Sequence, residues 1–101
     1  MKKEKTISTL SAVEHIITQP TSFSKFDLDK FDGEDIADIL EVHPNLIKIF
    51  DLKKMDGYDI SRVIVAHPST YPIFDLTKLN SEDWDYVKQH RPTWMKYFRK
   101  N

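Results

Sequence analysis

Two histidines, His43 and His67, each directly precede a proline and lie in matching sequence surroundings. Imidazole side chains ligate metals and titrate near neutral pH. Equivalent positions on packed helices lie about 10 Å apart, too far for both to reach a zinc ion whose ligands bind at ~2 Å. Because Gln19 and Arg91 hold the same position in other copies of the surrounding pattern, we expect helix-end residues that donate to the last carbonyl groups. The alternative is a polar ladder that contacts a partner or senses pH.

Acidic residues at Asp27, Asp29 and Asp32, followed by Gly33, resemble the start of a calcium loop. An EF-hand places oxygen ligands at its first, third and fifth positions and glycine at its sixth. Here Phe31 is fifth and Gly33 is seventh. We therefore expect a turn with a helix N-cap, in which an aspartate followed three residues later by lysine stabilises the turn, and no metal site.

Catalytic groupings are missing from the sequence. The chain has no cysteine, and no Ser/His/Asp set, glycine-rich phosphate loop or pair of catalytic carboxylates stands out. The acids and histidines that do stand out recur between copies, whereas an active site is usually unique. We expect a protein that is not an enzyme and that needs no cofactor.

These residues belong to a repeat of constant period, which is marked by prolines at positions 20, 44, 68 and 92. Three copies open with Phe-Asp-Leu-x-Lys, at 26–30, 50–54 and 74–78. A fixed period of this length is typical of stacked arrays. Apolar residues at i, i+3 and i+4, N-cap residues before them and a proline after them predict helices over 33–42, 57–66 and 81–90.

A second, shorter element is expected after each proline, because proline suits the first position of a helix or 3₁₀ turn. In the middle copy, 50–73, Pro72 should reduce this element to a turn. Residues 6–18 are predicted to form a divergent capping helix. The expected fold is an all-α, short helical-repeat solenoid of about four units in one domain, 1–101. Its parts are a divergent N-terminal cap (1–25), three repeats (26–49, 50–73 and 74–97) and a tail (98–101).

The unit resembles known short repeats. Residues 66–72, Ala-His-Pro-Ser-Thr-Tyr-Pro, are similar to the leucine-rich variant repeat, whose unit also joins a helix to a helical turn through Asn/His-Pro. The Asp-Leu-x-Lys-Leu-Asp-Gly pattern resembles short repeats of uncharacterised bacterial and bacteriophage proteins. The resemblance implies a structural array and suggests no catalytic residues for this chain. It further implies a phage or mobile-element accessory protein, such as an inhibitor that acts on a host protein.

Charge is unevenly distributed although the net charge is only −1. Residues 26–49 carry seven acidic residues against two lysines, and both ends of the chain are basic. Such a gradient favours an oriented partner; the alternative is a solvated face with basic tails. No apolar run is long enough for a membrane span or a signal peptide, so we expect a cytoplasmic protein without membrane contact.

Positions that point away from the apolar stripes vary between copies and are our candidates for binding another protein. Tyrosine and arginine are over-represented at binding hot spots, and incidental exposure is the alternative. The candidates are Tyr58, Arg62, Val65, Tyr86, Glu34, Asp38 and Glu41. Ala37 and Ser61 are also expected on this outward side.

The C-terminal stretch mixes basic and aromatic residues, a composition that can neutralise and stack on nucleic acid. The residues of this alternative are Arg91, Trp94, Lys96, Arg99 and Lys100. Equally, Trp94, Tyr97 and Phe98 would plug the open end of the array while the bases stay solvated. A third hypothesis is a structural array that self-assembles by end-to-end stacking, and the oligomeric state stays open.

Overall fold

The computed structural model describes residues 7–98, and every secondary-structure element within that range is helical. The all-helical class is confirmed, and the three central helices have the predicted bounds. The α-helices are α1 (Ile7–Thr18), α2 (Gly33–Val42), α3 (Gly57–Ala66), α4 (Ser81–His90) and α5 (Met95–Phe98). The 3₁₀ helices are η1 (Pro20–Lys25), η2 (Leu28–Lys30), η3 (Pro44–Ile49), η4 (Leu52–Lys54), η5 (Pro68–Ile73), η6 (Leu76–Lys78) and η7 (Pro92–Trp94).

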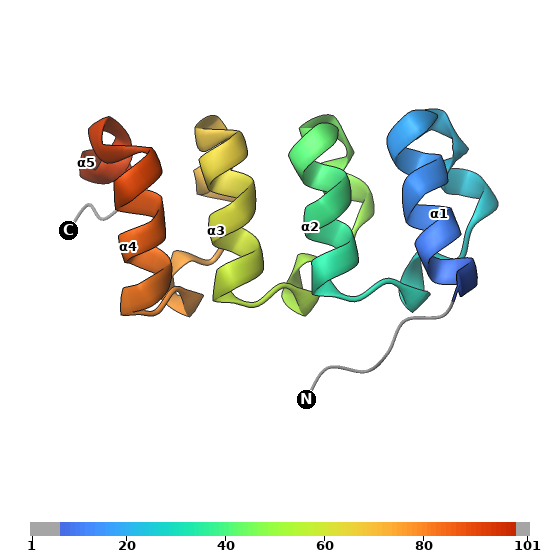
Figure 1. Cartoon of the computed structure of the whole chain (residues 1–101), viewed down its shortest axis with the longest axis horizontal. Helices are drawn as coiled ribbons and strands as arrows, with labels where there is room; N and C mark the ends of the chain where they lie inside the picture. The colour runs from blue at the N-terminus through green and yellow to red at the C-terminus, as the bar shows by residue number, and fades with distance from the viewer. Residues whose placement is uncertain (1–6, 99–101) are drawn as a thin grey trace.

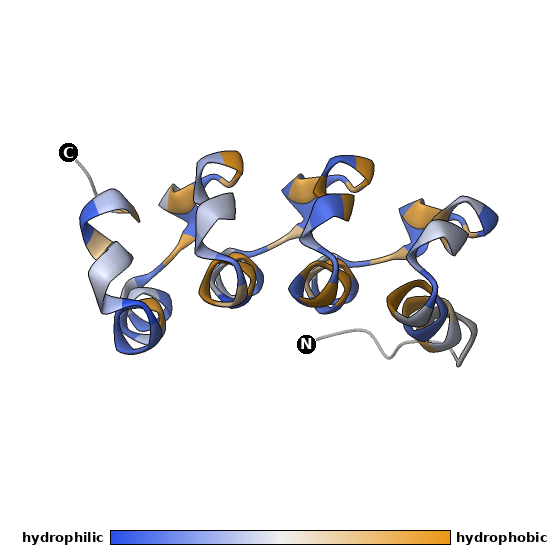
Figure 2. Cartoon of the chain, turned by 90° about the horizontal axis from the view of Figure 1, so that it is seen from above, coloured by the Kyte–Doolittle hydropathy of each residue, from blue (hydrophilic) through white to orange (hydrophobic). Residues whose placement is uncertain are grey.

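The four longer helices stand side by side in chain order, with α1 and α4 at opposite ends of the row (Figure 1). Each of them packs directly against the next. Seen from above, the short helices form a second layer along one side of the long ones (Figure 2). One side chain on a long helix can therefore contact its own short helices, a neighbouring long helix or solvent.

Each central helix begins with a capping box, in which two residues cap each other's backbone. In α2 the Asp35 N–H donates to Asp32 Oδ1 at 2.9 Å, and the Asp32 N–H donates to Asp35 Oδ2 at 3.0 Å. The same pair of bonds opens α3 and α4, with Asp56 and Asn80 as the N-caps. These bonds confirm the predicted helix starts. An N-cap of this kind contributes about 1 kcal/mol to stability.

The core lies between the two layers. The i, i+3, i+4 stripe of α2, Ile36, Ile39 and Leu40, is at most 1% exposed, as is the equivalent stripe of α3. Phe31 is buried beside it. Ala37 and Ser61 are also fully buried, although the sequence placed both on the outward side. That placement is wrong because a row of helices buries lateral contacts as well as the stripe facing the second layer.

Two expectations about the short elements have different outcomes. Asp27 accepts a hydrogen bond from the Asp29 N–H and caps η2, as expected for a turn with an N-cap. The expectation that Pro72 reduces η5 to a turn is wrong, because η5 is a six-residue 3₁₀ helix like η1 and η3. The φ angle that the proline ring imposes lies within the range of a 3₁₀ helix.

Candidate functional site

Polar side chains that recur at one position of the repeat connect each long helix to the preceding one. His43 Nε2 donates to the Ile17 carbonyl and His67 Nε2 donates to the Glu41 carbonyl, both at 2.7 Å. Both carbonyls belong to the last turn of the preceding helix. The predicted use of these histidines at helix ends is confirmed, and the carbonyl groups come from the neighbouring helix.

The arginine at the same position acts in the same way. Arg91 Nε donates to the Val65 carbonyl of α3 at 2.8 Å. Because a carbonyl oxygen only accepts, the histidine Nε2 atoms must carry their protons in these bonds. Residue types that look unrelated in the sequence thus share one structural role.

The repeated lysines also reach the preceding copy. Lys54 Nζ donates to the carbonyls of Asp29, at 2.7 Å, and Phe31, at 3.0 Å. Lys78 Nζ makes the equivalent bonds to Lys53 and Met55. These lysines join neighbouring one-turn helices, a role that the sequence reading, which paired them with the aspartate three residues earlier, did not include.

Two glycines allow this close contact. A Cβ atom on Gly33 would lie under 3.0 Å from Lys54 backbone oxygen and from Met55 Cα. Gly57 faces the same obstruction from Lys78. Neither glycine has a positive φ, so the close approach of the next copy is what requires glycine. In the sequence, the sign of this requirement is the replacement of glycine by Ser81 in the last copy.

One set of outward positions on the long helices forms a surface, which we call the long-helix face. It takes three positions from each helix, spaced by four and three residues, so that they share one side of the helix. All seven residues predicted to bind a protein belong to it. Its members are Leu10, Glu14 and Ile17 on α1; Glu34, Asp38 and Glu41 on α2; Tyr58, Arg62 and Val65 on α3; and Glu82, Tyr86 and Gln89 on α4.

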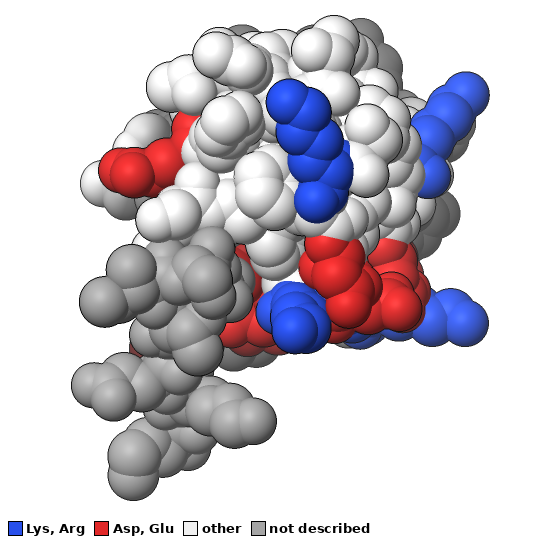
Figure 3. All heavy atoms as spheres, turned by 90° about the vertical axis from the view of Figure 1, so that its right-hand side faces the viewer, with Lys and Arg blue, Asp and Glu red and all other residues white. Residues whose placement is uncertain are grey.

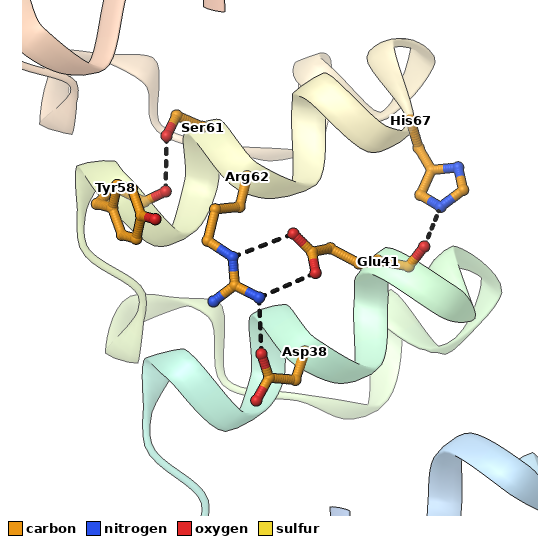
Figure 4. Close-up of polar contacts among 6 residues, drawn as sticks. All are labelled: Asp38, Glu41, Tyr58, Ser61, Arg62 and His67. Carbon is orange, nitrogen blue, oxygen red and sulfur yellow. Dashed lines mark hydrogen bonds and ion pairs between the residues drawn. The ribbon is translucent and has the colours of Figure 1, made fainter. Parts of the chain in front are cut away.

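Arg62 joins α3 to α2 within this face (Figure 4). Its Nη2 atom donates to Asp38 Oδ1 at 2.6 Å and to Glu41 Oε1 at 2.9 Å, and its Nε donates to Glu41 Oε2 at 3.0 Å. The Arg62 side chain is 15% exposed, against 38% for Asp38 and 34% for Glu41. The geometry is that of a bidentate arginine–carboxylate pair. Much of the hydrogen-bonding capacity of Arg62 is therefore used inside the molecule.

Electrostatics agree with this internal role. Burial lowers the pKa of Arg62, but its hydrogen bonds to Glu41 and then Asp38 raise the pKa by more. The guanidinium consequently keeps its charge in the fold. A partner that binds here meets an ion-paired triad with a net charge of −1, and not a free cation.

Other members of the face are more accessible. Tyr58 is 58% exposed, while Val65 is half-buried against the core. Tyr86 is half-buried, with its ring centroid 4.6 Å from that of His90. Leu10, at the same repeat position as Tyr58, is 49% exposed.

Sequence reasoning missed Leu10. The signal was available, because Leu10, Glu34, Tyr58 and Glu82 follow one another at the period of the repeat. It was overlooked because residues 6–18 were predicted to be a divergent capping helix. Ala12 and Ile16 are both buried at the ordinary positions of the stripe, so the register continues into α1.

A groove runs along the contact between α1 and α2, with a volume of about 610 Å³. We call it the α1–α2 groove. Its apolar side chains come from α1, and its carboxylates come from both helices. It is lined by Leu10, Ser11, Val13, Glu14, Ile17, Asp38 and Glu41.

At the other end of the row, aromatic rings cover α4. The Trp94 and Phe98 rings stack with centroids 5.9 Å apart, and Tyr71 meets Phe98 edge-on at 5.2 Å. Phe98 is buried, Trp94 is half-buried and Tyr97 is 47% exposed. Trp94 and Phe98 thus plug this end, as the sequence suggested, whereas Tyr97 remains largely accessible.

The basic residues of the nucleic-acid alternative are not gathered on one described surface. Arg91 donates to Val65, and Lys96 lies 5.3 Å from the centroid of the Tyr97 ring. Arg99 and Lys100 lie outside the described residues. The part of this candidate site that the structure describes therefore has one exposed cation, Lys96, and one arginine with an internal partner.

Within residues 7–98, histidines and acids do not form a group of three or more that could hold a metal ion. None of the helices there is long and apolar enough to cross a membrane. No family model, curated protein or solved structure matches this chain, so the resemblance to the leucine-rich variant repeat stays a prediction.

Proposed function

We propose that the chain is a short helical-repeat solenoid that binds another protein through its long-helix face and catalyses no reaction. The solenoid reading is supported by α2, α3 and α4, which begin at the same position of successive copies, and by hydrogen bonds that recur between those copies. In such an array each unit contacts mainly its neighbours. The residues that recur between copies are then explained by their structural contacts, so the residues that vary are the candidates for binding.

The observation that carries the proposal is a pair of exposed apolar side chains at one position of the face. Leu10 and Tyr58 are 49% and 58% exposed, and neither belongs to the buried core. Acidic residues hold the same position in α2 and α4, so the position itself does not require an apolar residue. Exposed apolar groups with polar surroundings are typical of protein-binding surfaces.

A capture experiment with a matched control tests the proposal. Tagged wild-type protein is expected to retain a partner from extracts of its native cells, and Tyr58→Glu is expected to lose it. Ile73→Glu is the control, because Ile73 is 51% exposed but lies on η5 in the other layer. Equal retention by wild type and Tyr58→Glu, with both variants folded by circular dichroism, would contradict binding through this face.

The resemblance to bacterial and phage repeats extends the proposal to an accessory protein that inhibits a host protein. The nucleic-acid alternative has less support, because Arg91 and Trp94 both have partners within the fold. A salt-sensitive mobility shift that is lost when Lys96, Arg99 and Lys100 are neutralised would favour that alternative instead.

A further inference from the structure

Two neighbouring contacts between long helices can be compared position by position, because the sequence repeat aligns them. Between α2 and α3, Arg62 reaches back to Asp38 and Glu41. One copy earlier, the position of Arg62 is held by Asp38, and the positions of Asp38 and Glu41 are held by Glu14 and Ile17. The α1–α2 contact thus places an acid opposite an acid where the α2–α3 contact has a cation between acids.

This difference has a physical consequence for the α1–α2 groove. Glu14 and Asp38 cannot bridge the two helices, since like charges at facing positions repel. Asp38 instead binds Arg62 on its other side. Glu14 is exposed, and the groove opens between the helices with Glu14, Asp38 and Glu41 along it.

Apolar side chains complete the groove. Leu10 is exposed at one end, and Val13 and Ile17 also line it. Seen from the α1 end, acidic side chains reach the surface with lysine or arginine side chains beside some of them (Figure 3). The described lining of the groove itself combines carboxylates and apolar side chains without a lysine or arginine. A surface of this kind complements a ligand that carries positive charge and an apolar side.

We propose that the α1–α2 groove binds a basic amphipathic helix of a partner protein, with an arginine of that helix between Glu14 and Asp38. Arg62 is the internal precedent, because it already binds two carboxylates of this face in bidentate geometry. An apolar side chain of the partner covers Leu10. This inference rests on the proposed protein-binding function and names the chemical class of the partner.

The size of the groove sets the size of the probe. Helix α1 has 12 residues, or about 18 Å at 1.5 Å per residue. The probe is a fluorescein-labelled synthetic peptide of about 12 residues, with arginine and leucine on one side at i, i+3, i+4 and i+7. A second peptide with glutamate in place of each arginine is the matched ligand control.

The experiment measures fluorescence anisotropy with the full chain at low salt. The arginine peptide is expected to bind, and its affinity should fall about tenfold in Glu14→Lys, as is typical of reversing a charge that contacts a partner. Leu10→Asp should weaken binding as well, whereas Asp85→Lys, an exposed acid on α4 outside the long-helix face, should not. Added salt should weaken binding through screening, and the glutamate peptide should not bind.

Amide NMR spectra locate the peptide and check folding. Chemical-shift changes confined to residues of α1 and α2 support the inference. If Leu10→Asp does not fold, Leu10→Ser replaces it in the binding measurement, and its amide spectrum shows whether it is folded. Chemical-shift changes near Tyr58 and Tyr86, with binding unchanged in Glu14→Lys, would overturn the assignment of the groove as the binding site. They would leave the proposal of protein binding through the long-helix face intact.

Three other outcomes would also overturn the inference. One is no anisotropy change with the arginine peptide. The second is a set of groove shifts that follow protein concentration without peptide, which would identify a second copy as the occupant. The third is binding that appears only after residues 1–6 are deleted, which would assign the groove to the chain's own N-terminal segment. None of these results decides the capture experiment with Tyr58→Glu, so the two proposals can fail separately.

Discussion

Helices α3 and α4 have the same start, length and end within the repeat, but only α3 has a long helix on both sides (Figure 1). Ser61 of α3 is fully buried, whereas Asp85 at the same position of α4 is exposed. Gly57 opens α3 and Ser81 opens α4. The residue at a repeat position therefore depends on whether another copy follows.

This difference also bears on assembly. A Cβ atom at Gly57 would collide with the Lys78 backbone of the next copy, and Ser81 carries a Cβ at that position. A second molecule that stacked on α4 with backbone atoms in the place of Lys78 would meet the same collision. Ser81 is therefore less suited than Gly57 to the close approach of a following copy.

The largest effect that follows from this comparison is expected for Gly57→Ala. The added methyl group overlaps backbone atoms of Lys78, which cannot move as a flexible side chain can. We expect a loss of about 2 to 3 kcal/mol in the free energy of unfolding, the range of overpacking in a fixed contact. Urea denaturation measures it.

Ser81→Ala is the matched control, since it retains a Cβ atom at the end of the array. Its change should stay within about 0.5 kcal/mol, as for most surface substitutions. Equal losses in the two variants would mean that α3 and α4 do not differ in the way proposed.

A smaller effect is expected from Arg62, which ties α3 to α2, while Tyr86 at the same position of α4 makes no ion pair. Arg62→Ala should lower the free energy of unfolding by about 1 to 2 kcal/mol, less than for a fully buried pair because both carboxylates are about a third exposed. Urea denaturation in low and high salt would show a loss that salt reduces. A loss independent of salt would assign the effect to packing of the arginine stem.

Periodicity explains why much of the fold was predictable. Local signals mark the starts and ends of helices: Asp32 caps α2 through bonds within four residues, and Pro44 follows its end. Apolar spacing then identifies the stripe that faces the second layer. All of this information lies within one copy of the repeat.

Contacts between copies were harder to predict, because their partners lie 21 to 26 residues away. Lys54 seemed suited to pair with Asp51 nearby, yet it donates to Asp29 and Phe31. The same limit applies to the candidate site. Residue types identified the face, but only the packing of the helices shows that Arg62 is occupied and that no described residue supplies an equivalent cation to the α1–α2 groove.

His67 offers a third comparison, with Arg91 at the same position. His67→Ala removes one hydrogen bond to the Glu41 carbonyl, and Arg91→Ala removes one to the Val65 carbonyl. Each variant should lose about 1 kcal/mol of the free energy of unfolding, the usual net contribution of a hydrogen bond. The double variant should lose the sum, because the two bonds share no partner. A loss in the double variant well below the sum would show that the two contacts are coupled.

The smallest expected effect concerns the turns that precede α3 and α4, which differ by Lys53 in one copy and Thr77 in the other. The Thr77 hydroxyl and backbone N–H both donate to Asp75 Oδ1, and these bonds lower the pKa of Asp75 below its ordinary value of 3.8. A carboxyl with a lowered pKa stabilises the fold above its unfolded pKa, and that contribution is lost as the pH falls through the folded value. Thr77→Ala removes the hydroxyl bond, which is the largest cause of the lowering, so the pKa of Asp75 should rise toward 3.8. A carbon-detected NMR titration of the Asp75 carboxyl measures the shift, and an unchanged pKa would assign the lowering to the backbone N–H and Lys78 instead.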